Sequence, residues 1–267
     1  MSDNVAIAPE AKASWQGARA VGGNLQFRRA LLLLALLGAW EFAAAFLVNP
    51  FWSSRPTLVI ERLAAMTMDG SLWRHTSITL LEAGAGLMLG ALVGIPLGVL
   101  LARAPRTSDT VEPLIMGIYG LPRVALAPLF ILWFGIGLFS KIMMSFTMVV
   151  FVFLLNVREG VRSADPDLLD LMRSMRASPL YTARTVLLPG IVPWILAAFR
   201  LGIGLSLIGA VVGELVGSSR GLGWYIQSSG GQLDTTGVFT GLTVLMIIAM
   251  LANQLIALFE KGVILWR

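Results

Sequence analysis

Asp165-Pro-Asp-Leu-Leu-Asp-Leu-Met-Arg-Ser-Met-Arg-Ala-Ser-Pro179 is a short charged stretch between two strongly apolar ones. Asp165 is a favourable N-cap, and Pro166 suits the first helical position, where its missing N–H is not needed. Asp167 suits the positive end of the helix dipole. Four apolar residues share one helix face at a spacing of i, i+3, i+4 and i+7: Leu168, Leu171, Met172 and Met175. The pattern predicts a short amphipathic helix that begins at Pro166.

The opposite face of this helix is polar and consists of Asp170, Arg173, Ser174 and Arg176. Ser178-Pro179 repeats the combination of cap and proline, so a second helix is expected to begin there and to run to about Leu188. Pro189-Gly190 is expected to stop it. Taken alone, the alternative is an ordinary amphipathic hairpin that lies on a membrane surface.

The composition indicates an all-α, polytopic membrane protein. Of the 267 residues, 57% are hydrophobic and 13% are charged, and the mean hydropathy is +0.80. A soluble domain could not bury that much apolar surface, so the solvent is the lipid bilayer. The chain has no cysteine and a single histidine, His75, which excludes disulfides and Cys or His metal clusters, and we expect no cofactor. The positive charges are spread over loops, so we expect no nucleic-acid partner.

Six apolar stretches are long enough to cross a bilayer as helices: about 30–48, 77–101, 113–134, 141–157, 190–216 and 238–259. The first is interpreted as a retained helix, because Glu41 interrupts it and the polar segment before it is long for a signal peptide. Pro122 and Pro128 are expected to disturb the third span. Pro56 to Met68 is expected to form a short interfacial helix.

The distribution of lysine and arginine predicts the orientation. With the N-terminus inside, most of these residues fall in inner segments, so both termini and the charged stretch are predicted to be cytoplasmic. Residues 1–27 are expected to form a loose tail, and residues 28–267 the transmembrane domain, with the two-helix loop at 163–189.

Small and polar residues inside the spans indicate how the helices pack. Glycines recur every fourth residue at Gly86, Gly90, Gly94 and Gly98, and again at Gly209, Gly213 and Gly217. This spacing is typical of closely packed membrane helices. Ionisable side chains that would be costly in lipid are expected to face the bundle interior, an interface or a pathway: Glu41, Glu82, Arg123, Arg200 and Glu214. Arg123 is the best placed of these to meet an anionic solute, and the candidate translocation residues are Pro122, Arg123, Ser206 and Glu214.

The sequence lacks a nucleotide-binding motif and a hydrolase motif in a suitable context. No lysine follows glycine as G-K-[ST], so the chain lacks a Walker A motif, and any ATP that drives it must bind another chain. Gly217-Ser-Ser-Arg-Gly221 matches the G-x-S-x-G pattern of hydrolases, but it follows a membrane helix instead of a strand, and His75 is the sole candidate base. We therefore expect no enzymatic activity.

At the charged stretch, the chain resembles the inner-membrane permease subunits of binding-protein-dependent ABC importers. Their loop pattern, E-A-A, three residues, G and then a later Leu-Pro pair, aligns with Asp170-Leu171-Met172, Arg176 and Leu188-Pro189. Arg176 stands where the family has glycine. A left-handed arginine costs about 1–2 kcal/mol, so either Arg176 stays helical and the corner moves to Ala177, or the loop carries strain.

Three further segments are similar to the nitrate, sulfonate, taurine and bicarbonate branch of these permeases: Leu121 to Gly137, Val211 to Leu215 and Gly221 to Ile226. The resemblance implies an inner-membrane protein that works with cytoplasmic ATP-binding subunits, a periplasmic solute-binding protein and a second permease copy. It also makes the two-helix loop the element that docks in the ATPase. The coupling residues it implies are Asp167, Leu168, Asp170, Leu171, Met172, Arg173, Met175, Arg176, Ala177, Ser178, Pro179, Leu188 and Pro189.

The expected function is therefore that of a permease subunit of an ATP-driven importer, which forms the path for a small solute such as a sulfonate. Two alternatives stay open at this point. An ion-coupled secondary carrier or channel would need an ion path through Glu82, Glu214 and Arg123. A membrane anchor without transport would use Arg123 for assembly alone.

Overall fold

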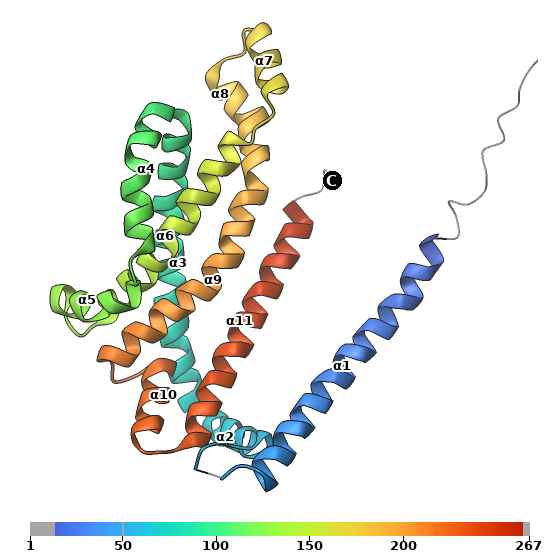
Figure 1. Ribbon diagram of the computed structural model, residues 1–267, viewed down its shortest axis with the longest axis vertical. Coiled ribbons are helices and arrows are strands. Elements are labelled where there is room, and N and C mark those ends of the chain that lie inside the picture. Colours follow the sequence, from blue (N-terminus) through green and yellow to red (C-terminus); the bar gives the residue numbers. More distant parts are fainter. Residues whose placement is uncertain (1–13, 50, 264–267) are drawn as a thin grey trace, which may run out of the picture. The chain divides into compact units, whose positions relative to one another are not determined.

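The computed structural model describes residues 14–49 and 51–263, and every regular element in that part of the chain is helical (Figure 1). The elements are α1 (Ser14–Phe46), α2 (Pro56–Met68), α3 (Ser71–Arg103), α4 (Pro105–Gly120), a 3-10 turn (Arg123–Leu126), α5 (Ala127–Phe134), α6 (Leu138–Arg162), α7 (Pro166–Ser174), α8 (Pro179–Thr182), a π-helical turn (Ala183–Leu187), α9 (Leu188–Gly217), α10 (Leu222–Gly231) and α11 (Thr235–Val263). The predicted all-α fold is confirmed. Five of these helices are long and apolar enough to cross a membrane, or six if the bent pair formed by α4 and α5 is one span.

The chain divides into two units, Met1–Glu61 and Arg62–Arg267, which we describe separately. In the first unit, α1 begins at Ser14, so the expected loose tail is wrong for residues 14–27; residues 1–13 lie outside the described part. No proline occurs between Pro9 and Pro50, and a helix extends easily once its apolar part has formed. Glu41 accepts hydrogen bonds from the N–H and the hydroxyl of Thr57, at 3.1 and 2.9 Å, near the start of α2.

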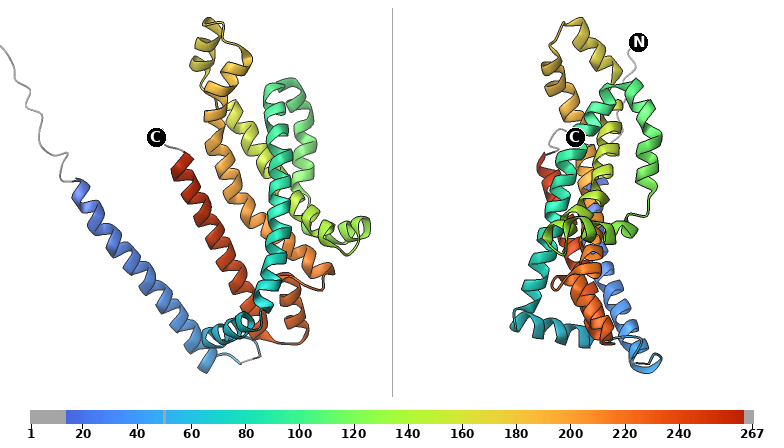
Figure 2. Two further views of the ribbon diagram at one scale, coloured as in Figure 1. Left: turned by 180° about the vertical axis from the view of Figure 1, so that it is seen from behind. Right: turned by 90° about the vertical axis from the view of Figure 1, so that its left-hand side faces the viewer.

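The second unit is built around α6, which α3 and α9 flank along its length (Figure 2). The glycine stripes make this packing possible. A Cβ atom at Gly94 of α3 would lie 2.5 Å from the carbonyl oxygen of Val150 and 2.7 Å from the Cβ of Phe153. On the other flank, a Cβ atom at Gly209 of α9 would lie 2.6 Å from the Cα of Ser145. The predicted role of both stripes in helix packing is confirmed.

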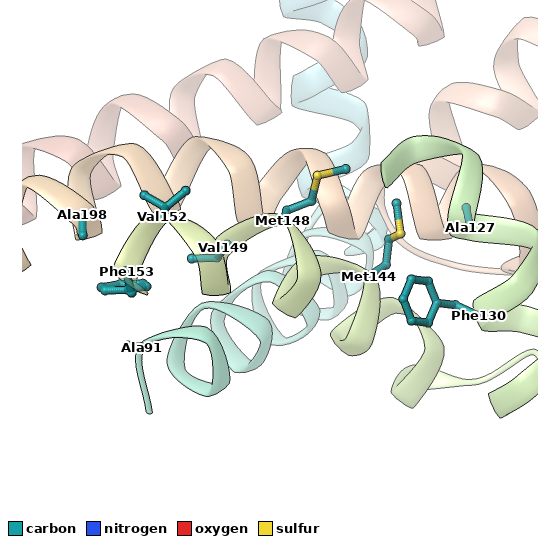
Figure 3. Packing of buried hydrophobic residues seen from close by; sticks show 9 residues of the cluster. All are labelled: Ala91, Ala127, Phe130, Met144, Met148, Val149, Val152, Phe153 and Ala198. Atoms are coloured by element: carbon teal, nitrogen blue, oxygen red, sulfur yellow. The ribbon is translucent and has the colours of Figure 1, made fainter. Parts of the chain in front are cut away.

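Apolar side chains fill the space between these helices. One cluster joins α3, α5, α6 and α9 (Figure 3), and its members are Ala91, Ala127, Phe130, Met144, Met148, Val149, Val152, Phe153 and Ala198. A second cluster joins α3 and α9 to α10 and α11, and its members are Ala83, Ile203, Leu207, Ala210, Leu222, Val244 and Ile248. The two clusters hold opposite sides of α9, so that helix is fixed within the unit.

The third predicted span is broken, as its prolines indicated. Helices α4 and α5 meet at a bend of 78° around Leu121 and Pro122. Helix α4 also starts earlier than predicted, at Pro105, because proline is well tolerated in the first turn of a helix.

The expected stop at Pro189-Gly190 is wrong. The chain continues as helix from Pro179 through the π-helical turn into α9, over 39 residues to Gly217. In that turn the N–H of Leu188 donates to the carbonyl of Ala183, five residues earlier. The wider turn directly precedes Pro189, whose ring and missing N–H would disrupt a regular α-helical ladder. Helix α8 is thus continuous with a long apolar helix.

Candidate functional site

The candidate coupling loop, residues 163–189, projects at one end of the second unit, and α10 lies at the opposite end (Figure 1). Helix α7 begins as predicted: the side chain of Asp165 accepts a 2.9 Å hydrogen bond from the N–H of Asp167. Arg173 pairs with Asp170 at 2.7 Å on the polar face. Helix α8 begins in the same way, with the hydroxyl of Ser178 accepting from the N–H of Tyr181 at 3.2 Å.

The apolar face of α7 is largely uncovered. Leu168, Leu171 and Met175 are 45%, 51% and 66% exposed, whereas Met172 is half-buried. Leu180 and Tyr181 of α8, which the sequence did not single out, are also exposed. Their signal in the sequence was weak because two apolar residues in one short turn define no periodicity. The exposed side chains of Leu168, Leu171, Met175, Leu180 and Tyr181 are here called the apolar face of the loop, and so much exposed apolar surface in one short loop indicates an interaction site.

Arg176 occupies the corner between the two helices with φ at +51°, in the left-handed region. The N–H of Arg176 donates to the carbonyl of Arg173 at 2.9 Å, and the N–H of Ala177 donates to that of Met172 at 3.0 Å. These two bonds form a Schellman motif, which normally has glycine at the position of Arg176. Of the two expected outcomes, the loop therefore takes the strained one. The corner does not move to Ala177.

The base of the loop is anchored to the bundle. Gly160 of α6 lies against the ring of Trp194 in α9, and a Cβ atom there would be 2.6 Å from the indole Cγ. Arg158 of α6 is buried and pairs with Glu112 of α4 at 3.0 Å. Leu188 and Pro189, predicted as the end of the loop, belong to the first turn of α9. The second helix of the loop therefore leads directly into α9, and the packing at Gly160 holds α9 against α6.

The candidate path residues Pro122 and Arg123 lie at the bend between α4 and α5. The guanidinium of Arg123 donates to the carbonyls of Met148 and Tyr119, at 3.0 and 2.8 Å. It also stacks on the rings of Tyr119 and Phe151, with its central carbon 4.6 and 5.5 Å from the ring centroids. The guanidinium of Arg123 thus links the bend between α4 and α5 to α6.

The other two candidates, Ser206 and Glu214, are buried in α9. The carbonyl of Ser206 accepts a 2.7 Å hydrogen bond from the hydroxyl of Ser145 in α6, so it belongs to the interface between those helices. Glu214 accepts from the hydroxyl of Thr79 in α3 at 2.6 Å and from the N–H of Gly223 in α10. Within residues 14–49 and 51–263, no hydrogen bond or ion pair joins either of them to Arg123.

Glu214 belongs to a network that fixes the start of α10. Thr79 accepts from the N–H of Leu222 at 2.8 Å, and Nδ1 of His75 accepts from the N–H of Gly221 at 3.1 Å. A Cβ atom at Gly221, whose φ is +106°, would collide with the carboxylate of Glu214. The network places a carboxylate at the positive end of a helix dipole. Sequence analysis missed Thr79, which carries no charge and stands more than a hundred residues from its partners.

Residues 94–265 match the model of a protein family described as binding-protein-dependent transport system inner membrane component. The chain belongs to this family. The permease is thus a non-enzymatic membrane subunit of an ABC transporter, as predicted. The ion-coupled carrier is not favoured.

Relatives support the predicted branch. The permease is 29% identical to the putative aliphatic sulfonates transport permease protein SsuC of Bacillus subtilis (strain 168), over 89% of this chain and 86% of that protein. It is 31% identical to the taurine transport system permease protein TauC of Escherichia coli (strain K12), over 85% of each chain. Among solved structures, an inward-facing MetNI methionine ABC transporter has a TM-score of 0.66 at 23% identity. That match covers 74% of this chain and 98% of that one, and it supports the fold.

Proposed function

We propose that the permease imports a small anionic solute of the sulfonate class, driven by separate ATP-binding subunits that grip the loop at 163–189. The observation that carries this proposal is the apolar face of the loop, exposed on a helix pair whose second helix, α8, is continuous with α9. Burial in lipid does not account for it well, because the same short helix carries Asp167, Asp170 and Arg173 and is capped by Asp165. A groove in a partner protein accounts for it directly.

The proposed orientation follows from charge. The loop carries arginines at 173, 176 and 184, which favours the cytoplasmic side, where both termini would also lie. The end that bears α10 would then face the periplasm and a solute-binding protein. A second copy of the permease would complete the path in the inner membrane. The implied contacts with the ATPase extend from Asp167 to Pro179, while Leu188 and Pro189, in the first turn of α9, would carry movement into that helix.

Co-purification with the ATP-binding subunit tests the proposal. Burial of one leucine side chain contributes about 1.5–3 kcal/mol, so Leu168→Asp and Leu171→Asp should each weaken the complex by about 10-fold or more and abolish uptake. Ser174→Asp introduces the same charge on the opposite face of α7 and serves as the matched control. Wild-type levels of ATPase binding by both leucine variants would refute the docking role.

A second measurement separates the proposed function from ion-driven transport. Vesicles that contain the complete transporter should take up solute when ATP is supplied, and an imposed proton or sodium gradient should not replace ATP. Uptake that follows the gradient in vesicles without ATP would contradict the proposal.

A further inference from the structure

A polar pocket lies at the end of the bundle that bears α10, away from the coupling loop. Its volume is about 360 Å³, at the lower end of the range typical of small-molecule sites. Its walls come from α3, from the loop before α6, from the first turn of α6 and from the loop after α9. The polar lining residues are Ser77, Glu82, Lys141, Ser218, Ser219 and Arg220.

Glu82 is the first sign of a ligand. Its side chain is 2% exposed, yet Oε2 has no hydrogen-bond partner within the described part of the chain. The neighbouring Glu214 differs, because Thr79 and the N–H of Gly223 occupy its two oxygens. A buried carboxylate oxygen without a partner is costly, so a donor that enters the pocket would gain a strong hydrogen bond there.

Lys141 is the second sign. It is 3% exposed, and the described residues provide no hydrogen bond or ion pair to its ammonium group. Its position is set by packing, since a Cβ atom at Gly213 would lie 2.9 Å from Cγ of Lys141. The exposed guanidinium of Arg220 lines the same pocket and likewise has no partner in the described chain. Glu82 and Glu214 are close enough to Lys141 to attract its charge. Even so, two cations and one acceptor oxygen in this cavity have no hydrogen-bond partner in the described part of the chain.

We propose that this pocket binds a small zwitterionic solute, with its anionic group between Lys141 and Arg220 and its ammonium group at Oε2 of Glu82. The inference rests on the proposed transport function and narrows its substrate class from anions to zwitterions. A plain anion satisfies the cations but leaves Glu82 without a donor. A plain amine satisfies Glu82 but leaves the two cations without an anion. In the proposed orientation, the pocket is the first site in the permease that a solute from the periplasm reaches.

Binding of taurine, 2-aminoethanesulfonate, to the purified full-length permease tests the proposal. Scintillation proximity with radiolabelled taurine should give saturable binding below about 10 mM. Unlabelled ethanesulfonate and ethylamine, which each lack one of the two charges, should compete about 10-fold or more weakly than taurine, because each leaves a buried charge unpaired. Equal competition by ethanesulfonate, or no saturable binding of taurine, would overturn the zwitterion site.

Substitutions of the lining residues test whether taurine binds in this pocket. Glu82→Gln and Arg220→Ala should each weaken taurine binding by about 10- to 100-fold. Arg74→Ala removes an exposed cation from α3 that does not line the pocket, and it should bind like the wild type. Arg220 lies on an exposed loop, so its variant should remain folded even if replacement of Glu82 disturbs the bundle. Unchanged affinity in Arg220→Ala would overturn the assignment. ATP-driven uptake, measured in parallel, reports on the proposed function independently of this result.

Discussion

Replacement of Arg176 by glycine should stabilise the corner of the coupling loop. Arg176 has a φ of +51°, and a residue with a side chain costs about 1–2 kcal/mol in the left-handed region. Glycine removes that cost but gives the unfolded chain more freedom, which offsets about 0.4–1 kcal/mol. The net gain is about 0–1.5 kcal/mol. The Schellman bonds of Arg176 and Ala177 are retained, because they need the left-handed backbone and no side chain.

Hydrogen exchange at the amides of Arg176 and Ala177 measures this gain, because both amides are donors in the motif. Their exchange in the Arg176→Gly variant should slow by up to about 10-fold if local opening controls it. Arg176→Ala removes the charge but keeps the left-handed cost, so it is the matched control and should exchange like the wild type. Arg176→Val should exchange faster, because a β-branched residue tolerates positive φ worst.

Two results would refute this reasoning. Faster exchange in the glycine variant would mean that the arginine side chain stabilises the corner through a contact that outweighs its backbone cost. Equal slowing in the alanine and glycine variants would mean that loss of charge, and not backbone geometry, is responsible.

Three further predictions concern stability. Gly94→Ala should destabilise the detergent-solubilised permease by about 1–3 kcal/mol in thermal unfolding, since its Cβ would lie 2.5 Å from a carbonyl oxygen of α6. The control is Gly84→Ala, whose Cβ would have nothing within 4 Å and which should be neutral or stabilising. Asp165→Ala should lower the stability of α7 by about 0.5–2 kcal/mol and speed amide exchange at Asp167, and Asp165→Ser should restore the cap; equal exchange in both variants would contradict this. Arg123→Ala should cost about 1–3 kcal/mol in thermal unfolding, because it removes two hydrogen bonds and the stacking on two aromatic rings. Unchanged stability with lost uptake would instead favour contact with the solute.

Capping residues, prolines and glycine spacing in the sequence correctly predicted several helix ends, one broken span and close helix packing. The caps at Asp165 and Ser178 form as expected, and α2 has its predicted bounds of Pro56 and Met68. The glycine stripes predicted close helix packing, and the prolines predicted the broken third span. Each of these features follows from a pattern of residues within one helix or at one helix end. Their physical causes are therefore visible in the sequence itself.

Features that depend on distant partners could not be predicted in this way. Lys141 stands at the start of the span predicted at 141–157, and its burial follows from the approach of Gly213 in α9. Arg123 looked like a residue for an anionic solute, but the carbonyl of Met148 and the ring of Phe151 occupy its guanidinium. Glu214 likewise gains its role from α10. In each case the deciding group is supplied by another helix.

The error at Pro189 has the largest consequence for function. A proline normally ends or kinks a helix, so the coupling loop was expected to meet the membrane helix at a break. The π-helical turn removes that break, and helix continues from Pro179 to Gly217. Glycine contacts hold this helix against α6 at Ser145 and Lys141, and Glu214 near its far end holds the start of α10. One continuous helix therefore connects the surface proposed for the ATPase with the walls of the polar pocket. If the ATPase binds the loop as proposed, a connection of this kind, without a break at Pro189, would carry a shift at the loop along α9 to the walls of the pocket.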